Sequence, residues 1–327
     1  MDLDLAQPER RAALLRLLRA GGLGAAAVGA GLWLSARSRR PQQAAVAMAQ
    51  RNLSVAADPQ WPAMVVAQGA DPAALVRVAV ERIGGMRRFV SRGDVVVIKP
   101  NIAWDRTPEQ AATTNPEVVA ALVRLCLEAG ARKAIVTDVS VNDARSAFER
   151  SGIAAAARSA GAELVLPEAR LFRDVDLRGE VLGVWPVLEP FLTADKVINV
   201  PIAKHHSLTG ATLGGKNWYG ILGGQRQRLH QRINESLADL LAFLRPTLTI
   251  LDAYRVLMRN GPTGGSLNDV SLKETVIAST DPIAVDAYAA QAWWGLDERT
   301  LVYLRLAAER NLGTTRFDSL RVDSVRL

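Results

Sequence analysis

Short runs of Val and Ile recur along this chain between amphipathic helical stretches, and this alternation is the feature that most constrains the fold. VVVIK at 95–99 is followed by the helical stretch VVAALVRLCLEA at 118–129 and then by KAIVTD at 133–138. Continuous apolar runs of this kind are typical of parallel strands buried on both faces, joined by a crossover helix. The pattern predicts an α/β protein with mostly parallel sheets covered by helices.

The same reading assigns the remaining elements and divides the chain. Further strands are expected at 163–168, 196–202, 248–253 and 274–279, and helices at 71–89, 143–159, 235–244, 282–294 and 299–311. The stretch 169–195 has the weakest pattern and is expected to join two lobes irregularly. We therefore expect three parts, namely an N-terminal segment at 1–49, a first α/β lobe at 50–195 and a second at 196–327, with a cleft between the lobes.

The N-terminal segment has the composition of a targeting sequence. Arg10 and Arg11 precede a Gly- and Ala-rich uncharged run at 20–36, and Ala-Met-Ala at 47–49 resembles a cleavage site. This order is typical of a twin-arginine export signal. Three Arg within 37–40 leave two alternatives open, a short membrane anchor or an ordinary surface helix, because the uncharged run only reaches the lower limit for a span. We expect a periplasmic or exported protein whose N-terminal segment meets the export machinery or the membrane.

Charge and cysteine content exclude several classes of partner and cofactor. The N-terminal segment holds seven Arg against three acids, which leaves 33 basic and 30 acidic residues in the rest of the chain. This near balance gives no basic surface, so nucleic acid is not an expected partner. Cys126 is the single cysteine and lies in an apolar run. No disulfide and no cysteine-ligated iron–sulfur cluster can therefore form within the chain.

Polar side chains follow most of the predicted strands. Lys99, Asn101, Asp138 and Asp252 stand at or just after strand ends, as does Asp281. Ligands in open α/β sheets bind beyond the carboxyl ends of the strands, so we assign the first four residues to a common ligand-binding site. A structural alternative exists for each: the Asp residues can cap helices or shape turns, and Lys99 can be solvated.

All three histidines fall within one glycine-rich segment at 204–230. Its GATLGGK sequence is similar to a phosphate-binding loop, but Asn217 replaces the magnesium-binding Ser or Thr, and later glycines would break the required helix. We expect Lys216 to bind an anionic group, beside backbone N–H donors. His206 is the candidate acid/base, with Lys204 and Lys216 as further catalytic residues and Asn217 as a ligand-binding residue.

A metal site is a further possibility in this segment. His230 is the candidate ligand, joined by a carboxylate such as Asp138 or Asp252, which would suit a divalent ion. No close ligand spacing accompanies it. The cofactor is otherwise open.

Several segments of the chain resemble a known family. Four segments are similar to the domain-of-unknown-function family 362: VVIKPNI at 96–102, KHHSLTGATLGGKNWYGILGG at 204–224, NGPTGG at 260–265 and STDPIAVDAYAA at 279–290. The resemblance implies an α/β fold without a settled reaction. More distantly, the segment from His206 to Gly224 is similar to the nickel-pincer lactate racemases. That likeness implies a cofactor-tethering Lys216, proton or hydride transfer by His206 and a metal-binding His230.

The residues together favour an exported enzyme that uses acid/base or isomerase-like chemistry on a small anionic substrate in the cleft between the lobes. Two alternatives remain. One is a non-catalytic protein that binds a small ligand in the same cleft, and the other is an accessory protein for cofactor assembly or redox reactions. An enzyme is expected to place a His or Lys of perturbed pKa near a carboxylate, whereas a binding protein is not.

Overall fold

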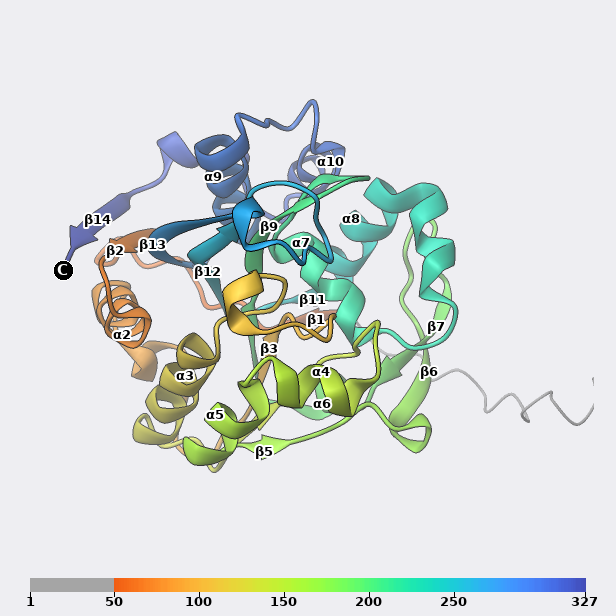
Figure 1. Ribbon diagram of the computed structural model, residues 1–327, viewed down its shortest axis with the longest axis horizontal. Coiled ribbons are helices and arrows are strands. Elements are labelled where there is room, and N and C mark those ends of the chain that lie inside the picture. Colours follow the sequence, from red (N-terminus) through yellow and green to blue (C-terminus); the bar gives the residue numbers. More distant parts are fainter. Residues whose placement is uncertain (1–49) are drawn as a thin grey trace, which may run out of the picture. The chain divides into compact units, whose positions relative to one another are not determined.

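The computed structural model describes residues 50–327 (Figure 1). The predicted export signal or anchor at 1–49 lies outside the described residues. Within 50–327, no helix combines the length and the apolar character needed to cross a membrane.

A ten-stranded mixed sheet forms the centre of the described structure. Its strands follow the order β14, β2, β13, β12, β8, β3, β4 and β5, with β9 beside β12 and β10 beside β9. The bounds are β2 (Met64–Gln68), β3 (Val95–Pro100), β4 (Lys133–Val136), β5 (Glu163–Leu164), β8 (Lys196–Val200), β9 (Ile202–His206), β10 (Gly210–Thr212), β12 (Leu248–Leu257), β13 (Val270–Ser279) and β14 (Val322–Arg326). Most neighbours pair in parallel, and β13 with β2 and β12, and β10 with β9, pair antiparallel. The predicted α/β class with mostly parallel strands is confirmed.

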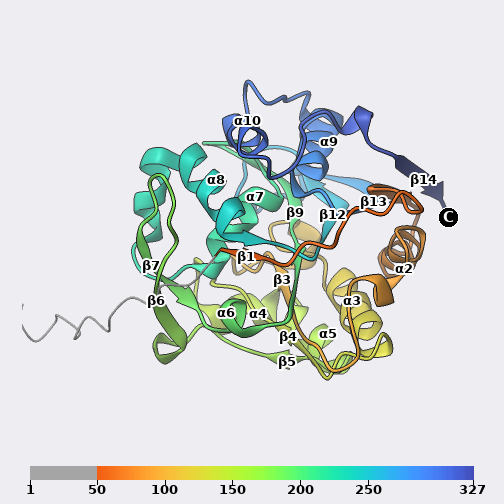
Figure 2. The same ribbon diagram turned by 180° about the vertical axis from the view of Figure 1, so that it is seen from behind.

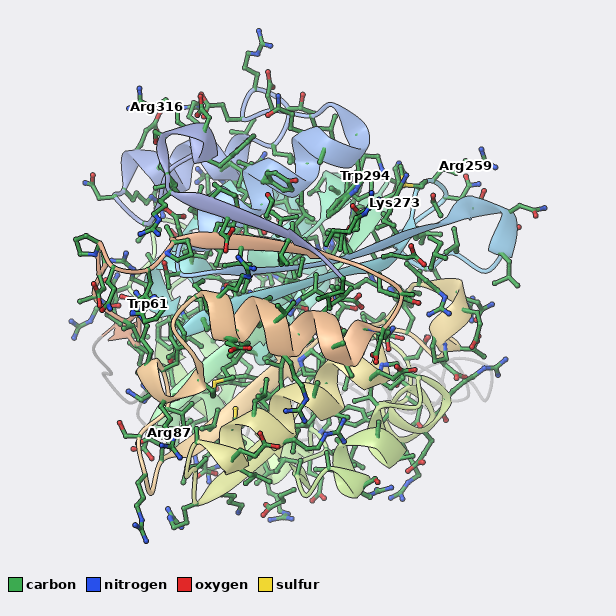
Figure 3. The ribbon with its side chains drawn as sticks, turned by 90° about the vertical axis from the view of Figure 1, so that its left-hand side faces the viewer. Trp61, Arg87, Arg259, Lys273, Trp294 and Arg316 are labelled. Carbon is green, nitrogen blue, oxygen red and sulfur yellow. The ribbon has the colours of Figure 1, made fainter. Side chains whose placement is uncertain are left out.

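Helices cover both faces of the sheet because successive strand residues point to opposite sides. In β3, Val96 and Ile98 belong to one apolar core, whereas Val97 belongs to the other. The first core lies under α2 (Pro72–Arg82), α3 (Pro116–Glu128), α4 (Ala144–Arg150) and α5 (Ile153–Ser159). The second lies under α8 (Ile233–Phe243), α9 (Pro282–Trp294) and α10 (Val302–Glu309). Figures 1 and 2 show the two groups on opposite sides, and Figure 3 looks onto α2 beside β2 and β13.

The remaining short elements lie in the connections between these strands and helices. They are β1 (Arg51–Asn52), which pairs with β11 (Leu244–Arg245), the helices α6 (Pro190–Thr193) and α7 (Gly214–Asn217), and 3-10 turns such as Trp218–Ile221 and Arg226–Arg232. The helix at 282–294 has its predicted bounds. Asp281 caps it, and its side chain accepts hydrogen bonds from the backbone N–H groups of Ile283 and Ala284. The capping alternative thus describes Asp281.

Three predicted elements are shorter than expected, and in the two helices among them glycine is the cause. The helix expected at 71–89 ends at Arg82, since Gly84 and Gly85 follow with φ of 114° and 76°. The helix expected at 143–159 is two helices, α4 and α5, with Gly152 between them at φ 72°. These left-handed conformations cost little for glycine and stop a helix. The strand expected at 163–168 is paired only at β5.

The sheet also changes the predicted division of the chain. β8 pairs with β3 and β2 pairs with β13, so strands from both sides of position 195 share one sheet. The two predicted lobes are therefore not separate at this position. The stretch 169–195, expected to be irregular, contains an antiparallel hairpin of β6 (Phe172–Asp176) and β7 (Val184–Leu188). Its strands are only partly buried, which explains their weak apolar pattern.

Candidate functional site

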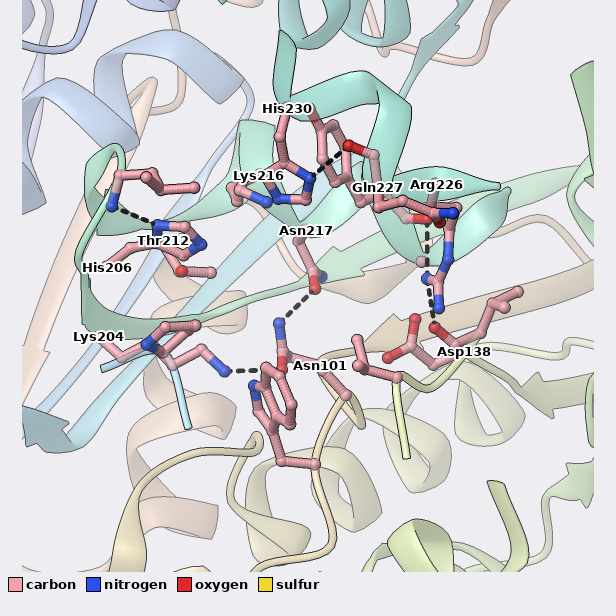
Figure 4. Close-up of a pocket in the computed structure, with 18 of the residues that line it drawn as sticks. Asn101, Asp138, Lys204, His206, Thr212, Lys216, Asn217, Arg226, Gln227 and His230 are labelled. Atoms are coloured by element: carbon pink, nitrogen blue, oxygen red, sulfur yellow. Dashed lines mark hydrogen bonds between the residues drawn. The ribbon is translucent and has the colours of Figure 1, made fainter. Parts of the chain in front are cut away.

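A cavity of about 490 Å³ opens where β3, β4 and β9 end. Ligands in open α/β sheets bind at this edge, beyond the carboxyl ends of the strands. Eight of the nine residues predicted for the site line the cavity. They are Lys99, Asn101, Asp138, Lys204, His206, Lys216, Asn217 and His230. Figure 4 shows Lys204, Asn101 and Asp138 along one side of the cavity, with Lys216 and His230 across from them. The fold therefore brings eight of the predicted residues together around one cavity.

A buried ion pair forms the base of the cavity. Nζ of Lys99 lies 2.7 Å from Oδ1 of Asp138, and both side chains are almost completely buried. The other carboxylate oxygen, Oδ2, accepts a hydrogen bond of 2.6 Å from the backbone N–H of Ile102. Burial lowers the pKa of Lys99, and the Asp138 charge opposes this effect. The pair thus joins the ends of the neighbouring strands β3 and β4.

Two amides extend this network across the site. Oδ1 of Asn217 accepts hydrogen bonds from Lys99 Nζ at 2.9 Å and from Asn101 Nδ2 at 3.1 Å. Oδ1 of Asn101 then accepts one of 3.1 Å from Nζ of Lys204. Lys204 also donates to the backbone carbonyl of Ala112. These contacts fix the amide orientations, because a lysine ammonium group can only donate and so must face the amide oxygen.

Asp286 holds the turn that carries Lys216 and Asn217. Its carboxylate accepts hydrogen bonds from the backbone N–H groups of Gly214 at 2.7 Å and Gly215 at 2.8 Å, and from the Tyr303 hydroxyl at 2.8 Å. A Cβ on either glycine would collide with Asp286 or Tyr303. The glycines are therefore needed for close approach of backbone to carboxylate, and the sequence GGKN forms the single turn of α7.

Lys216 extends from this turn into the cavity without a carboxylate partner among residues 50–327. Its Nζ lies 3.9 Å from the centre of the Tyr219 ring, a cation–π contact. The side chain is 9% exposed, and burial lowers its pKa to about 7, with the Arg226 charge adding to the effect. The pKa of Lys204 is also lowered to about 7, mainly by burial. Both amines can therefore gain or lose a proton near neutral pH.

His206 has a different chemical state from the one expected. Its Nδ1 accepts hydrogen bonds from the backbone N–H groups of Leu208 at 3.1 Å and Thr209 at 3.3 Å. The ring must then carry its proton on Nε2. Burial and the Lys216 charge lower its pKa to about 3, so the ring stays neutral. The expected acid/base role does not fit this arrangement, which makes His206 a neutral N–H donor.

His230 lies at the exposed rim and has the opposite tautomer. Its Nδ1 lies 3.2 Å from the backbone carbonyl of Gln227, which can only accept, so Nδ1 carries the proton and Nε2 is free. Residues 50–327 contain no group of three or more His, Cys, Asp or Glu side chains arranged to hold a metal. The carboxylate of Asp138 is already engaged by Lys99 and Ile102. The predicted metal role of His230 therefore has no partner ligands in this part of the chain.

Asp252 is the one predicted site residue that does not line the cavity. It is fully buried in β12, where its carboxylate accepts hydrogen bonds from the backbone N–H groups of Asn115 at 2.7 Å and Tyr254 at 3.0 Å. Burial raises its pKa to about 6. Asp252 thus anchors the start of α3, and its predicted place among the ligand-binding residues is corrected. The strand expected to end at 253 continues to Leu257, so Asp252 lies within β12 and its carboxylate is taken up by the backbone of Asn115 and Tyr254.

Several residues that line the cavity were not predicted from the sequence, and three of them bear directly on its chemistry. Arg226 donates hydrogen bonds to the backbone carbonyls of Val139 at 2.7 Å and Ser140 at 2.6 Å, and so holds the loop after β4. Tyr219 supplies the ring beside Lys216. Oγ1 of Thr212 is buried without a hydrogen-bond partner in the described structure. The only sequence signal for them is their position in the glycine-rich segment that contains the histidines.

Comparison with known proteins identifies the family of this chain. The sequence profile of a domain of unknown function (DUF362) matches residues 96–291, more than half of the chain. A thylakoid-associated protein of Synechocystis sp. is 30% identical over 255 residues, which cover 73% of this chain and 74% of that protein. The family resemblance predicted from the sequence is confirmed.

Two solved structures share a more distant likeness. One is the lactate racemase apoprotein from Thermoanaerobacterium thermosaccharolyticum, with a TM-score of 0.40 and 11% identity over 68% of this chain. The other is a structural-genomics protein from Thermotoga maritima, with a TM-score of 0.36 and 13% identity over 74% of this chain. This chain spans 55% and 60% of the lengths of those two proteins.

We expect Gly220→Ala to destabilise the protein through the Lys99–Asp138 pair. A Cβ at position 220 would overlap the Asp138 carboxylate and the Lys99 ammonium. Separating a buried ion pair leaves two charges poorly compensated, so the free energy of unfolding should fall by about 2 kcal/mol or more. Chemical denaturation measures this change. The control is Gly183→Ala, where a Cβ meets no atom within 4 Å. Equal effects of the two substitutions would contradict the interpretation.

Proposed function

Because this chain belongs to the DUF362 family, whose activity is not defined, we propose its function from its own cavity: an enzyme that binds a small anionic substrate and moves a proton on it. The observation that carries the proposal is the charge of the cavity lining. Among the described residues, Lys99, Lys204, Lys216 and Arg226 line it against the single carboxylate of Asp138. Buried charge without a counterion is unfavourable, so an anionic ligand would stabilise this cavity.

The lysines divide into positioning and reacting groups. Lys99 is held by Asp138 and Asn217, and it helps to fix the base of the site. Lys204 donates to Ala112 and Asn101. A neutral amine has two N–H bonds, so both contacts can persist while its lone pair accepts a proton from a substrate.

Lys216 faces the same cavity and, like Lys204, can gain or lose a proton near neutral pH. With pKa values of about 7, one amine can act as base while the other, protonated, stabilises developing negative charge. His206 contributes a neutral N–H donor to the substrate, and Thr212 a hydroxyl. This is proton transfer next to an anionic group, which agrees with the isomerase-like chemistry expected from the sequence.

A non-catalytic protein that binds a small anion is the second candidate, because the same positive cavity would serve it. In the enzyme, Lys204 accepts a proton from the bound substrate, whereas in the binding protein it only contributes to the positive charge of the cavity. An enzyme would catalyse exchange of deuterium into the acidic C–H next to the carbonyl of small 2-oxo carboxylates, which proton NMR detects in D₂O. Binding of these compounds without catalysed exchange would favour the second candidate.

We expect Lys216→Met to weaken anion binding without unfolding the protein. Removing the ammonium should raise the Kd for sulfate at least tenfold, which corresponds to about 1.4 kcal/mol. The free energy of unfolding should change by no more than about 1 kcal/mol, since the methionine retains the apolar stem while a poorly compensated buried charge is lost. Titration calorimetry and chemical denaturation measure the two quantities. Lys273→Met, outside the cavity, is the matched control, and undiminished sulfate binding by Lys216→Met would exclude Lys216 from the site.

Anion affinity should also fall as pH rises through about 7. Lys204 and Lys216 have lowered pKa values of about 7, so they lose their charges there, whereas ordinary lysines stay charged to about pH 10. Sulfate keeps its own charge across this range, and its Kd should rise up to about tenfold per pH unit for each proton that binding requires. His206 titrates near pH 3 and adds nothing above pH 5. A Kd that is constant from about pH 6 to 9 would contradict the assigned lysine states.

The location proposed for this enzyme is outside the cytoplasm. Arg10 and Arg11 before the run at 20–36 support a twin-arginine signal, and the relative's description as thylakoid-associated is compatible with an exported or membrane-associated protein. Changing both arginines to lysine should retain the protein in the cytoplasm, as cell fractionation would measure. Unchanged export of this variant would contradict the twin-arginine route.

A further inference from the structure

The cavity is much larger than a small anionic group requires. A carboxylate or sulfate group takes roughly the space of three or four water molecules, on the order of 100 Å³. The cavity measures about 490 Å³. Most of its volume is therefore available to the rest of a ligand, and its size is typical of sites that enclose a larger organic molecule.

Polar and apolar groups occupy different depths of this space. Lys99 and Lys204 are each 1% exposed and lie at the base. Leu208 and Val141 also line the cavity, but they are 67% and 57% exposed. Only six large hydrophobic side chains in the described chain are exposed to this degree, and two of them border this one opening. Charge therefore lies inside and apolar surface outside.

The apolar mouth is assembled from four separate loops. Trp104 follows β3, Val141 follows β4, Leu208 lies between β9 and β10, and Pro262 follows β12. The Leu208 loop is fixed in place, because the backbone N–H of Leu208 donates to the His206 ring. The hydrogen bond to the buried His206 ring thus holds the exposed Leu208 side chain at the opening of the cavity, where it can cover an apolar part of a ligand.

We propose that the substrate is an amphipathic anion, a soluble molecule whose charged group reaches the lysines and whose short apolar chain lies along Trp104, Val141, Leu208 and Pro262. This inference rests on the proposed anion-binding function and adds the chemical class of the remaining part of the substrate. The chain leaves the charged base of the cavity through its mouth. The apolar contact supplies affinity in proportion to the area that it removes from water.

Calorimetric titration of the full chain with propanoate, butanoate, hexanoate and octanoate tests the proposal. A methylene group that is fully buried tightens binding about fourfold, so partial burial of four of them should make the Kd of octanoate at least tenfold lower than that of butanoate. In the double variant Leu208→Ser, Val141→Ser the ratio of these two Kd values should fall below about threefold. Octan-1-ol, which has the chain without the charge, should bind at least tenfold more weakly than octanoate.

The control variant is Leu272→Ser, an exposed leucine of β13 that does not line the cavity. It should keep the full dependence on chain length. Binding of all four alkanoates with equal Kd would overturn the amphipathic substrate and leave the anion site standing, whereas failure of every alkanoate and of sulfate to bind would overturn both. Sedimentation with anionic phosphatidylglycerol vesicles, without binding to the monomeric alkanoates, would assign Leu208 and Val141 to a membrane contact and overturn the proposal.

Discussion

The buried ion pair between Lys99 and Asp138 is the interaction on which the site depends. A lysine in the interior is stable only when an opposite charge and further acceptors surround it, and here Asp138, Asn217 and the Pro100 carbonyl provide them. Each partner comes from a different element, so the pair ties β3 to the end of β4 and to α7. The position of Gly220 follows from the same pair, since any side chain there would occupy the space of the two charges.

Among the described residues, Lys99 is the cavity lysine that forms an ion pair with a carboxylate, whereas the other two cavity lysines do not. This difference explains the chemistry of the other cavity groups. Asp138 satisfies Lys99, whereas Lys204 and Lys216 have only neutral acceptors or an aromatic ring near them. Burial therefore lowers their pKa values toward neutrality. Burial, together with the positive charge of the neighbouring lysines, keeps His206 neutral. A cavity of this kind is suited to an anion, and it becomes less suited as the amines lose their protons.

The aspartates show how similar sequence positions acquire different functions. Asp138, Asp252 and Asp281 all lie at or near the ends of Val- and Ile-rich runs. Asp138 faces the cavity, Asp252 binds the backbone of Asn115 and Tyr254, and Asp281 caps α9. Asp286, within α9, supports the glycine turn of Lys216. The assignment of a carboxylate thus depends on which backbone N–H groups or cations lie within reach, and these come from remote parts of the chain.

The sequence by itself determined the α/β class, the main strands and helices, and a set of residues that the fold brings together around one cavity. These properties follow from local patterns, because apolar periodicity identifies buried strands and polar residues after them collect at one edge of the sheet. Eight predicted residues line the cavity for this reason. Only the tertiary structure decided the single sheet in place of two lobes, the exclusion of Asp252 and the tautomer of His206. Strand order, burial and hydrogen-bond partners are set by residues distant in sequence, so no local pattern contains them.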